Sequence, residues 1–461
     1  MREISPKLNA LSEMLALSSY GNTKNILMTA VEAHGPFDLD AMMLAVRQVS
    51  QDFPQLMSRI KEVREWGRYY VLREHCPDLV FPAIVSELPI ANSSASTFNN
   101  LMIHLTPLLD RHWDLFSEAP IRYHLVRVSS DHHIVAQIAH HAGADAGTAA
   151  ETGQRLFERY DEILKGKRPE WACQPHAIST SRKRMVQARK PPFKEILSNM
   201  RDTLGRFAEK TTLPVGSGKP DDLRQHHVKR KLTAEQSERV MRLSSDKGSS
   251  FVDRLVACTN TAIDRWNEAR EEAPGILTTS MSVNMRGRFS AVNRLNNSGL
   301  IFFKSRPEER KDPAAFAKSL ALARIKQFRR HMDFKFYQDV SRLNAVVRPF
   351  PFAVRSKIVN FVMNKHQFSA AITLLGVIWP ETRNGKPTAN TCLTRSGDFT
   401  ISEVHGVGYK LLSNTHLLLI VYVFRNQLNF LLHASACLFT RDEADAFMDL
   451  VIKNLLAGDL S

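Results

Sequence analysis

The sequence lacks the features that mark disulfide-rich, zinc-binding and membrane proteins. It has only five cysteines, an odd number without any CxxC spacing: Cys76, Cys173, Cys258, Cys392 and Cys437. Such sparse cysteines are typical of a reducing compartment. The longest unbroken apolar run, Leu417 to Phe424, is far shorter than the roughly 20 residues that a membrane-spanning helix needs. The N-terminus has no basic segment followed by an apolar stretch, so it does not predict a secretory signal. We expect a cytoplasmic protein without a transmembrane segment.

Several catalytic and binding motifs are also missing. No GxGxxG follows a predicted strand, and the chain has no Walker A sequence, no HExxH and no GxSxG. Two pairs of adjacent histidines, His132-His133 and His226-His227, raise the question of a metal site. Adjacent residues on a strand face opposite sides of the sheet, so neither pair can chelate one ion without help. We therefore expect no metal ion.

The charge of the chain is strongly positive, at +15, although its 43% of hydrophobic and 24% of charged residues are ordinary for a globular protein. No zinc finger, RNP signature or basic zipper accompanies this charge, so we expect no nucleic-acid partner. Basic residues gather at 181–190, 229–231 and 326–330. A substrate bearing phosphate, or an acidic carrier protein, would be attracted to such a surface. A solvated basic face without any partner is the alternative.

Strands and helices alternate in the first 166 residues. We expect a helix over 39–49 with Asp38 as its N-cap, and a hairpin over 121–128 and 132–139. Apolar residues at helical spacing over 156–164 predict a further helix that ends at Gly166. Thr148 and Glu151 stand three residues apart at the start of that helix, as in a capping box.

Residues 167–223 are interpreted as a basic connector, with one amphipathic helix near 193–207. Alternating elements then resume over 224–461. We expect strands at 227–232, 275–284, 299–305, 368–378, 417–424 and 428–434, and helices at 233–243, 250–267, 313–330 and 442–456. At 461 residues the chain is too long for one ordinary core. The simplest arrangement is a mixed α/β fold in two lobes of similar size, 1–166 and 224–461.

The most informative segment is His140-His141-Ala142-Gly143-Ala144-Asp145, which directly follows the apolar stretch 134–139. It places two imidazoles and a carboxylate on one strand-to-helix connection. Imidazole is the side chain best suited to proton transfer near neutral pH. Asp145 lies close to the helix N-terminus, where a carboxylate is favoured. Taken without context, both histidines could equally be packed or capping residues.

The segment resembles the HHxxxDG signature of the coenzyme A-dependent acyltransferase superfamily, which includes chloramphenicol acetyltransferase, condensation domains of nonribosomal peptide synthetases and wax ester synthases. Residues 119–128 resemble the strand that precedes the signature, 282–286 resemble an Asn-x-Arg segment of the second lobe, and 373–378 are similar to a later strand with a glycine. In order and separation these matches cover nearly the whole chain. The chain departs at one position, because Ala146 stands where the family has glycine. We expect the turn to survive with a negative φ there.

The resemblance implies a role for each residue of the site. His141 matches the general base, which takes a proton from the acceptor as it attacks a thioester carbonyl. Asp145 matches an aspartate with a structural role, and Arg286 matches the arginine that pairs with it. His140 is expected to be a structural neighbour. For the oxyanion of the tetrahedral intermediate, the Gly143 N–H and a hydroxyl near Thr373 are candidate donors.

The resemblance also implies two chloramphenicol-acetyltransferase-like lobes that form a V with a central tunnel. Its donor would be a thioester of coenzyme A or of carrier-protein phosphopantetheine, used as substrate and not as a bound cofactor. We expect a monomeric, stand-alone condensation-type acyltransferase of specialised metabolism that makes an ester or amide. One alternative is a coenzyme A-dependent alcohol O-acyltransferase of the wax ester synthase kind. Another is a catalytically silent relative that binds carriers, a reading that rests on Ala146.

Overall fold

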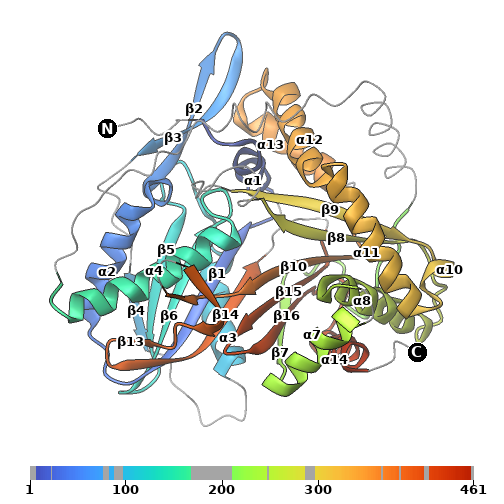
Figure 1. The fold of residues 1–461 in the computed structure, drawn as a ribbon. Coiled ribbons are helices and arrows are strands. Elements are labelled where there is room, and N and C mark those ends of the chain that lie inside the picture. Colours follow the sequence, from blue (N-terminus) through green and yellow to red (C-terminus); the bar gives the residue numbers. More distant parts are fainter. Residues whose placement is uncertain are drawn as a thin grey trace.

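The computed structural model describes residues 7–21, 23–75, 83–87, 97–167, 210–246, 249–285, 296–364, 367–383, 386–409 and 415–457. The described residues form a mixed α/β fold around two six-stranded sheets (Figure 1). The first sheet contains, in spatial order, β13 (Arg395–Ser396), β14 (Phe399–Tyr409), β1 (Ile26–His34), β6 (His132–His140), β5 (Ile121–Arg127) and β4 (Ala83–Glu87).

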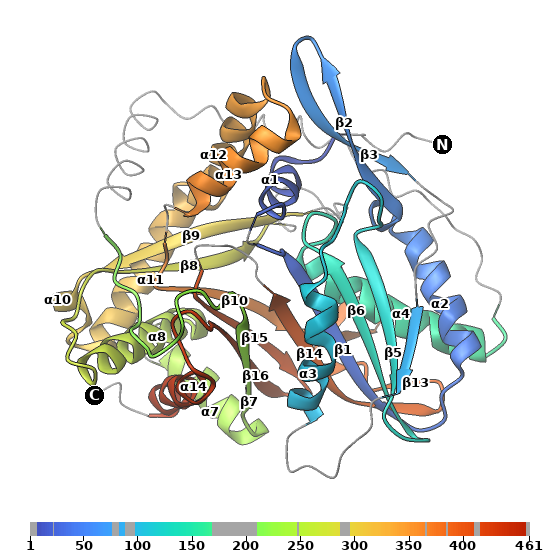
Figure 2. The same ribbon diagram turned by 180° about the vertical axis from the view of Figure 1, so that it is seen from behind.

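Helices cover both faces of this first sheet. On one face α4 (Ala146–Leu164) packs against α2 (Leu39–Asp52) and β1. On the opposite face lies α3 (Thr97–Asp110), as the front and back views show (Figures 1 and 2). Because helices cover both faces, the middle strands are almost wholly buried, and β6 exposes part of only its first residue.

The second sheet has the order β7 (Gln225–Lys231), β16 (Gln427–Ser435), β15 (Leu417–Phe424), β10 (Ala370–Val377), β8 (Leu277–Asn284) and β9 (Ser298–Ser305). The central helix on its outer face is α8 (Phe251–Glu268), which contacts α7 (Ala234–Asp246), α11 (Pro313–Arg329) and α14 (Arg441–Leu456). Their apolar stripes and the outer face of the sheet enclose a separate hydrophobic core.

The two halves of the sequence interlock. Strand β14 comes from the second half of the chain but pairs along its length with β1 in the first sheet. In return α1 (Ala10–Ser18) packs against α12 (Met332–Val347) and α13 (Phe352–Asn364). The sheets are also tied where the Tyr422 hydroxyl of β15 donates to the Val404 carbonyl of β14. The expected lobes, 1–166 and 224–461, therefore do not describe this exchange, in which each half of the chain contributes elements to the other half.

The remaining elements are shorter. The hairpin of β2 (Ser58–Glu65) and β3 (Arg68–His75) follows η1 (Pro54–Met57) and extends away from both sheets (Figures 1 and 2). A second small ribbon joins β11 (Pro380–Arg383) to β12 (Lys386–Cys392), and α10 (Pro307–Arg310) is a single turn. No helix in the described part of the chain is long and apolar enough to cross a membrane.

Most of the expected elements are present, with one error at a helix start. Asp38 caps α2 by accepting from the Ala41 N–H, and β5 and β6 form the expected hairpin. Helix α4, however, begins at Ala146, and its N-cap is Asp145. The expected capping box of Thr148 and Glu151 was wrong because Asp145, three residues earlier, already accepts from the Thr148 N–H.

Only part of the expected connector lies in the described ranges. The helix expected near 193–207 and the basic cluster at 181–190 lie outside them. Residues 210–223 run along the second half, where the Thr212 N–H donates to the Ile276 carbonyl and the Val215 N–H to the Asn267 side chain. The described cysteines, Cys258, Cys392 and Cys437, are free thiols.

Candidate functional site

The histidine-aspartate segment forms the tight turn between β6 and α4. Pairing with β1 places His140, the last residue of β6, opposite Ile26. The chain then turns sharply, and the Gly143 and Ala144 N–H groups both donate to the His140 carbonyl, at 2.9 and 3.3 Å. One residue past the strand, the His141 N–H donates to the Asn25 carbonyl at 2.7 Å. The backbone of the segment is thus fixed by hydrogen bonds within the turn and to the start of β1.

His140 is enclosed by protein on every side. Its side chain is fully buried, and its Nδ1 accepts from the Ala142 N–H at 3.1 Å. The indole of Trp113 meets the imidazole edge-on, with ring centroids 5.9 Å apart. Burial, reinforced by the positive charge that His141 and Arg122 can carry, lowers the pKa of His140 to about 3. His140 is therefore a neutral packing residue near neutral pH.

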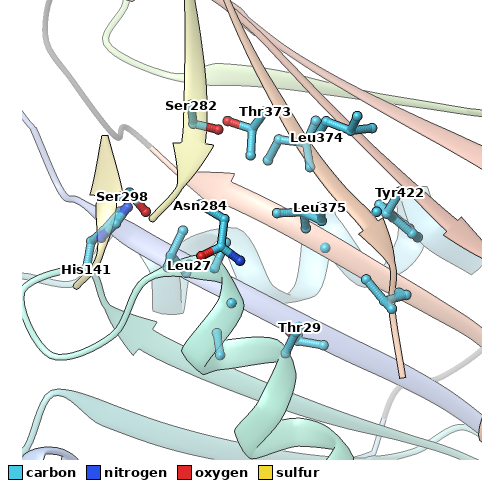
Figure 3. A pocket seen from close by; sticks show the side chains of 18 of the residues that line it. Leu27, Thr29, His141, Ser282, Asn284, Ser298, Thr373, Leu374, Leu375 and Tyr422 are labelled. Carbon is cyan, nitrogen blue, oxygen red and sulfur yellow. The ribbon is translucent and has the colours of Figure 1, made fainter. Parts of the chain in front are cut away.

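His141 faces a large cavity that lies among the described residues (Figure 3). Its ring nitrogen Nδ1 is buried and makes no hydrogen bond with the described residues. Burial lowers the pKa of His141, against smaller effects in the other direction that include the negative charge of Asp145. The ring is consequently neutral near pH 7, which is the state that can accept a proton.

Asp145 connects the turn to a distant strand. One carboxylate oxygen accepts from the Thr148 N–H at 2.8 Å and caps α4, while the other accepts from the Asn297 N–H at 2.9 Å. The carboxylate is 1% exposed. It therefore does not reach a substrate but joins the helix start to the segment before β9.

The segment Asn296-Asn297-Ser298 was not identified in the sequence, and it borders the site on the side of the second sheet. The Asn296 side chain donates to the His141 carbonyl and also to the Ser12 hydroxyl of α1. Ser298, the first residue of β9, lines the cavity near His141 (Figure 3). No motif in the sequence points to these residues, because their contacts bridge more than 150 positions.

Gly143 and Ala146 differ in how much space surrounds them. A methyl group on Gly143 would lie 2.6 Å from the Cβ and Cγ of Pro120, so glycine is required there for close packing. The Gly143 N–H is used by the turn, and Gly143 does not line the cavity. Ala146 does line it, and as the first residue of α4 it is not among the residues with positive φ. Alanine thus fits this backbone without strain, as expected.

The cavity has a volume of about 610 Å³ and lies between the two sheets. Strands β1 and β14 line it from one side, and β8, β9, β10 and β15 from the other. Most of the lining is apolar. Its uncharged hydrogen-bonding side chains come mainly from the second sheet: Ser280, Ser282, Asn284, Ser298, Thr373 and Tyr422. Such a surface suits an apolar group held next to a few polar contacts.

Thr373, one of the expected residues, lies on β10 and lines this cavity. In the close-up its hydroxyl and that of Ser282, on β8, point toward one another (Figure 3). Arg286 lies outside the described residues, which resume at Asn296, so the Asp145–Arg286 pair stays a prediction. Within residues 282–286, the three that line the cavity are Ser282, Val283 and Asn284.

Comparison with known proteins gives one curated relative and several solved structures; no family model matches the chain. The relative is the isonitrile lipopeptide synthase of Mycobacterium tuberculosis, which is 26% identical over 149 residues. These residues are 32% of this chain and only 6% of the synthase, so the chain matches a small part of a much longer protein.

The structural matches extend over almost the whole chain. The first condensation domain of the calcium-dependent antibiotic synthetase, solved with a substrate analogue, has a TM-score of 0.70 and 13% identity and covers 99% of this chain and 96% of its own. The starter condensation domain of rhizomide synthetase, solved with C8-CoA and Leu-SNAC, has a TM-score of 0.66 and 13% identity over 99% and 95%. Polyketide synthase associated protein 5 of Mycobacterium tuberculosis has a TM-score of 0.63 and 15% identity over 98% of both chains. The expected resemblance is thereby confirmed at the level of the fold.

Proposed function

Because the chain has the fold of condensation domains, we propose that it is an acyltransferase that moves an acyl group from a thioester to a hydroxyl or amine acceptor. The observation that carries the proposal is the position of His141. A neutral imidazole on a rigid turn lines an apolar cavity between two sheets. An acyl chain fits this lining, and a base at its edge fits proton removal from the acceptor.

The reaction requires no covalent enzyme intermediate. His141 accepts the proton of the acceptor while the oxygen or nitrogen of the acceptor attacks the thioester carbonyl. When the tetrahedral intermediate collapses, the carbon–sulfur bond breaks, and the sulfur takes this proton from His141 and leaves as a thiol. We assign the oxyanion contact to the Thr373 hydroxyl, with Ser282 beside it, since both face the cavity. Asp145, and Arg286 by resemblance, position the turn without touching substrate.

We propose a thioester of a carrier protein's phosphopantetheine arm or of coenzyme A as the donor. The relative is a lipopeptide synthase, and one structural match was solved with C8-CoA, which supports an acyl thioester of this kind. The net charge of +15 suits both donors, since carrier proteins are acidic and coenzyme A carries phosphates. Offering the same acyl group on each donor distinguishes them, and carrier binding should weaken as salt is added.

The test of the base is to replace His141 with Ala and assay transfer from a panel of acyl thioesters. Loss of a general base typically costs about 10²–10⁴-fold in rate. His331→Asn is the matched control, because His331 is an exposed residue in the left-handed region, which asparagine tolerates. Unchanged turnover in folded His141→Ala would refute the proposed base.

A second variant tests the catalytically silent alternative. If Ala146 had disabled the site, Ala146→Gly would raise activity by far more than tenfold. Since Ala146 sits without strain at the start of α4, we expect a change of less than about tenfold, which corresponds to about 1.4 kcal/mol.

Thr373→Val should lower turnover about 10²–10³-fold if the Thr373 hydroxyl stabilises the oxyanion, and Ser282→Ala measures the contribution of the neighbouring hydroxyl.

A further inference from the structure

A second group of histidines lies at the other end of β6, away from the proposed catalytic turn. Strand pairing places His34 of β1 directly opposite His132 of β6. Glu32 lies two residues before His34 on the same strand, so its side chain points to the same face of the sheet. The ligand atoms of these three side chains all lie within 4.8 Å of one another. One carboxylate and two imidazoles therefore lie close enough together to share one ion after small side-chain rotations.

The buried carboxylate is already oriented for a further contact. Glu32 Oε1 lies 2.7 Å from His405 Nε2, and His405 Nδ1 lies 3.0 Å from Lys229 Nζ. The lysine ammonium can only donate, so His405 Nδ1 is the acceptor and its Nε2–H donates to Glu32. A third contact, between Lys229 and Glu403, fixes the lysine. This chain of hydrogen bonds uses Oε1 of Glu32, whereas Oε2 lies on the side of His132, 3.7 Å from its Nε2.

The imidazole of His132 lacks a hydrogen bond that would explain its position. Its Nε2 is buried and lies 3.7 Å from Glu32 Oε2, which is too far for a hydrogen bond, and it makes none with the other described residues. Its ring stacks on that of His34, with centroids 4.2 Å apart. A buried ring nitrogen beside a carboxylate and a second imidazole is a donor set that divalent transition metals prefer.

We propose that Glu32, His34 and His132 bind a divalent transition-metal ion of the Zn²⁺ type, through Glu32 Oε2 and one nitrogen of each imidazole, with water completing the coordination. The stacked rings must tilt to direct their nitrogens at one ion, and rotation about the Cβ–Cγ bond of histidine has a broad minimum. His405 acts behind the ligands, because its hydrogen bond orients the carboxylate, as partners of metal ligands commonly do.

The ion would have a structural role. His132 and His140 are the two ends of the nine-residue strand β6, which puts the ion about 26 Å from the catalytic turn. It would join the end of β1 to the start of β6, and through Glu32, His405 and Lys229 it would extend to the second sheet. The proposal is independent of the acyltransferase function, since no step of that reaction involves these residues.

Metal titration of the purified chain tests the site. The protein is stripped with EDTA, dialysed, and titrated with ZnCl₂ against a coloured competing chelator; Co²⁺ is added separately as a spectroscopic probe. We expect one equivalent of tight Zn²⁺, visible Co²⁺ absorption of four- or five-coordinate character, and a melting temperature that rises with Zn²⁺.

Variants separate this site from adventitious binding. His34 is exposed, so His34→Ala should fold normally and lose at least tenfold in Zn²⁺ affinity. Glu32→Gln keeps the acceptor for His405 and should show the same loss, whereas His331→Asn should bind like the unmodified chain. Less than one equivalent of bound Zn²⁺, or equal affinity in His34→Ala, would overturn the proposal. His34→Ala keeps the test decisive even if Glu32→Gln fails to fold.

Discussion

Asp145 accepts a hydrogen bond from the backbone N–H of Asn297 at 2.9 Å, across 152 positions of sequence. The same carboxylate caps α4, so one buried side chain holds the turn that carries His141 against the segment that leads into β9. The position of His141 between the two sheets depends on this connection, because the neighbouring Asn296 also holds the His141 carbonyl.

Replacing Asp145 with Asn should reduce stability before it reduces chemistry. The asparagine can still cap α4 with its oxygen, but its amide group would then face the Asn297 N–H, donor against donor. An unsatisfied buried group costs about 1–3 kcal/mol, and loss of a buried pair with Arg286 would raise this to about 3–5 kcal/mol. Urea unfolding measures the loss, and activity is expressed per folded molecule.

The matched control for this variant is Asp38→Asn. Asp38 caps α2 by accepting from the Ala41 N–H at 2.9 Å, and asparagine is about as good an N-cap. The control should therefore unfold at nearly the same urea concentration as the unmodified chain. Normal unfolding of Asp145→Asn together with a complete loss of turnover would contradict the structural role of Asp145.

Gly143→Ala should strain the turn although it keeps the backbone N–H. The new methyl group would lie 2.6 Å from two carbons of Pro120, and forced overpacking of this kind costs about 1–3 kcal/mol. Thermal unfolding measures the cost. Combining the change with Pro120→Gly removes the obstructing ring, so the double variant should lose less than the sum of the single variants. Strict additivity would show that Pro120 is not what limits the space.

The sequence predicts the local elements of this fold better than their partners. The periodicity of residues 250–267 and 417–424 correctly indicates α8 and β15, because burial of one face or both faces leaves a repeating pattern. The residues of β14 do not by themselves indicate which sheet the strand joins. It depends on a register with β1 across more than 360 positions, and no local pattern records such a pairing.

The same limit applies to the candidate site. His141 and Asp145 are visible in the sequence because they share one turn and resemble a known signature. Asn296 and Ser298 are not, since only the folded chain brings them to that turn. The histidines give the clearest example. Sequence neighbours His132 and His133 face opposite sides of the sheet, as expected, but the structural partner of His132 is His34 on another strand.

Acid should destabilise the protein partly through His140. Its pKa is lowered to about 3 by burial, whereas the unfolded chain has the usual value near 6.5, so the unfolded state takes up the proton first. The stability that neutral His140 provides is complete above pH 6.5 and is lost as the pH falls from there toward 3. The loss is about 1.4 kcal/mol for each pH unit.

The variant His140→Asn tests this linkage. The Oδ1 of asparagine can accept from the Ala142 N–H as Nδ1 of the imidazole does, but it does not titrate. The free energy of unfolding is measured in urea at pH 5 and at pH 7. The two values should differ less in the variant, because asparagine does not take up the proton that His140 takes up on unfolding. An unchanged difference between the two pH values would mean that other buried histidines account for the acid sensitivity, among them His124 and His433.

The rate of acyl transfer should increase with pH along a curve set by His141. A general base works only when it is neutral, and burial lowers the pKa of His141 below the usual 6.5. The value of kcat/KM should therefore reach its plateau already near neutral pH and fall on the acid side, with a midpoint below 6.5. An alcohol acceptor is the suitable substrate, because it does not itself titrate in this range. Residual turnover of His141→Ala should lack this acid limb, while His331→Asn should keep it; a midpoint above 6.5 in the unmodified protein would contradict a buried histidine as the base.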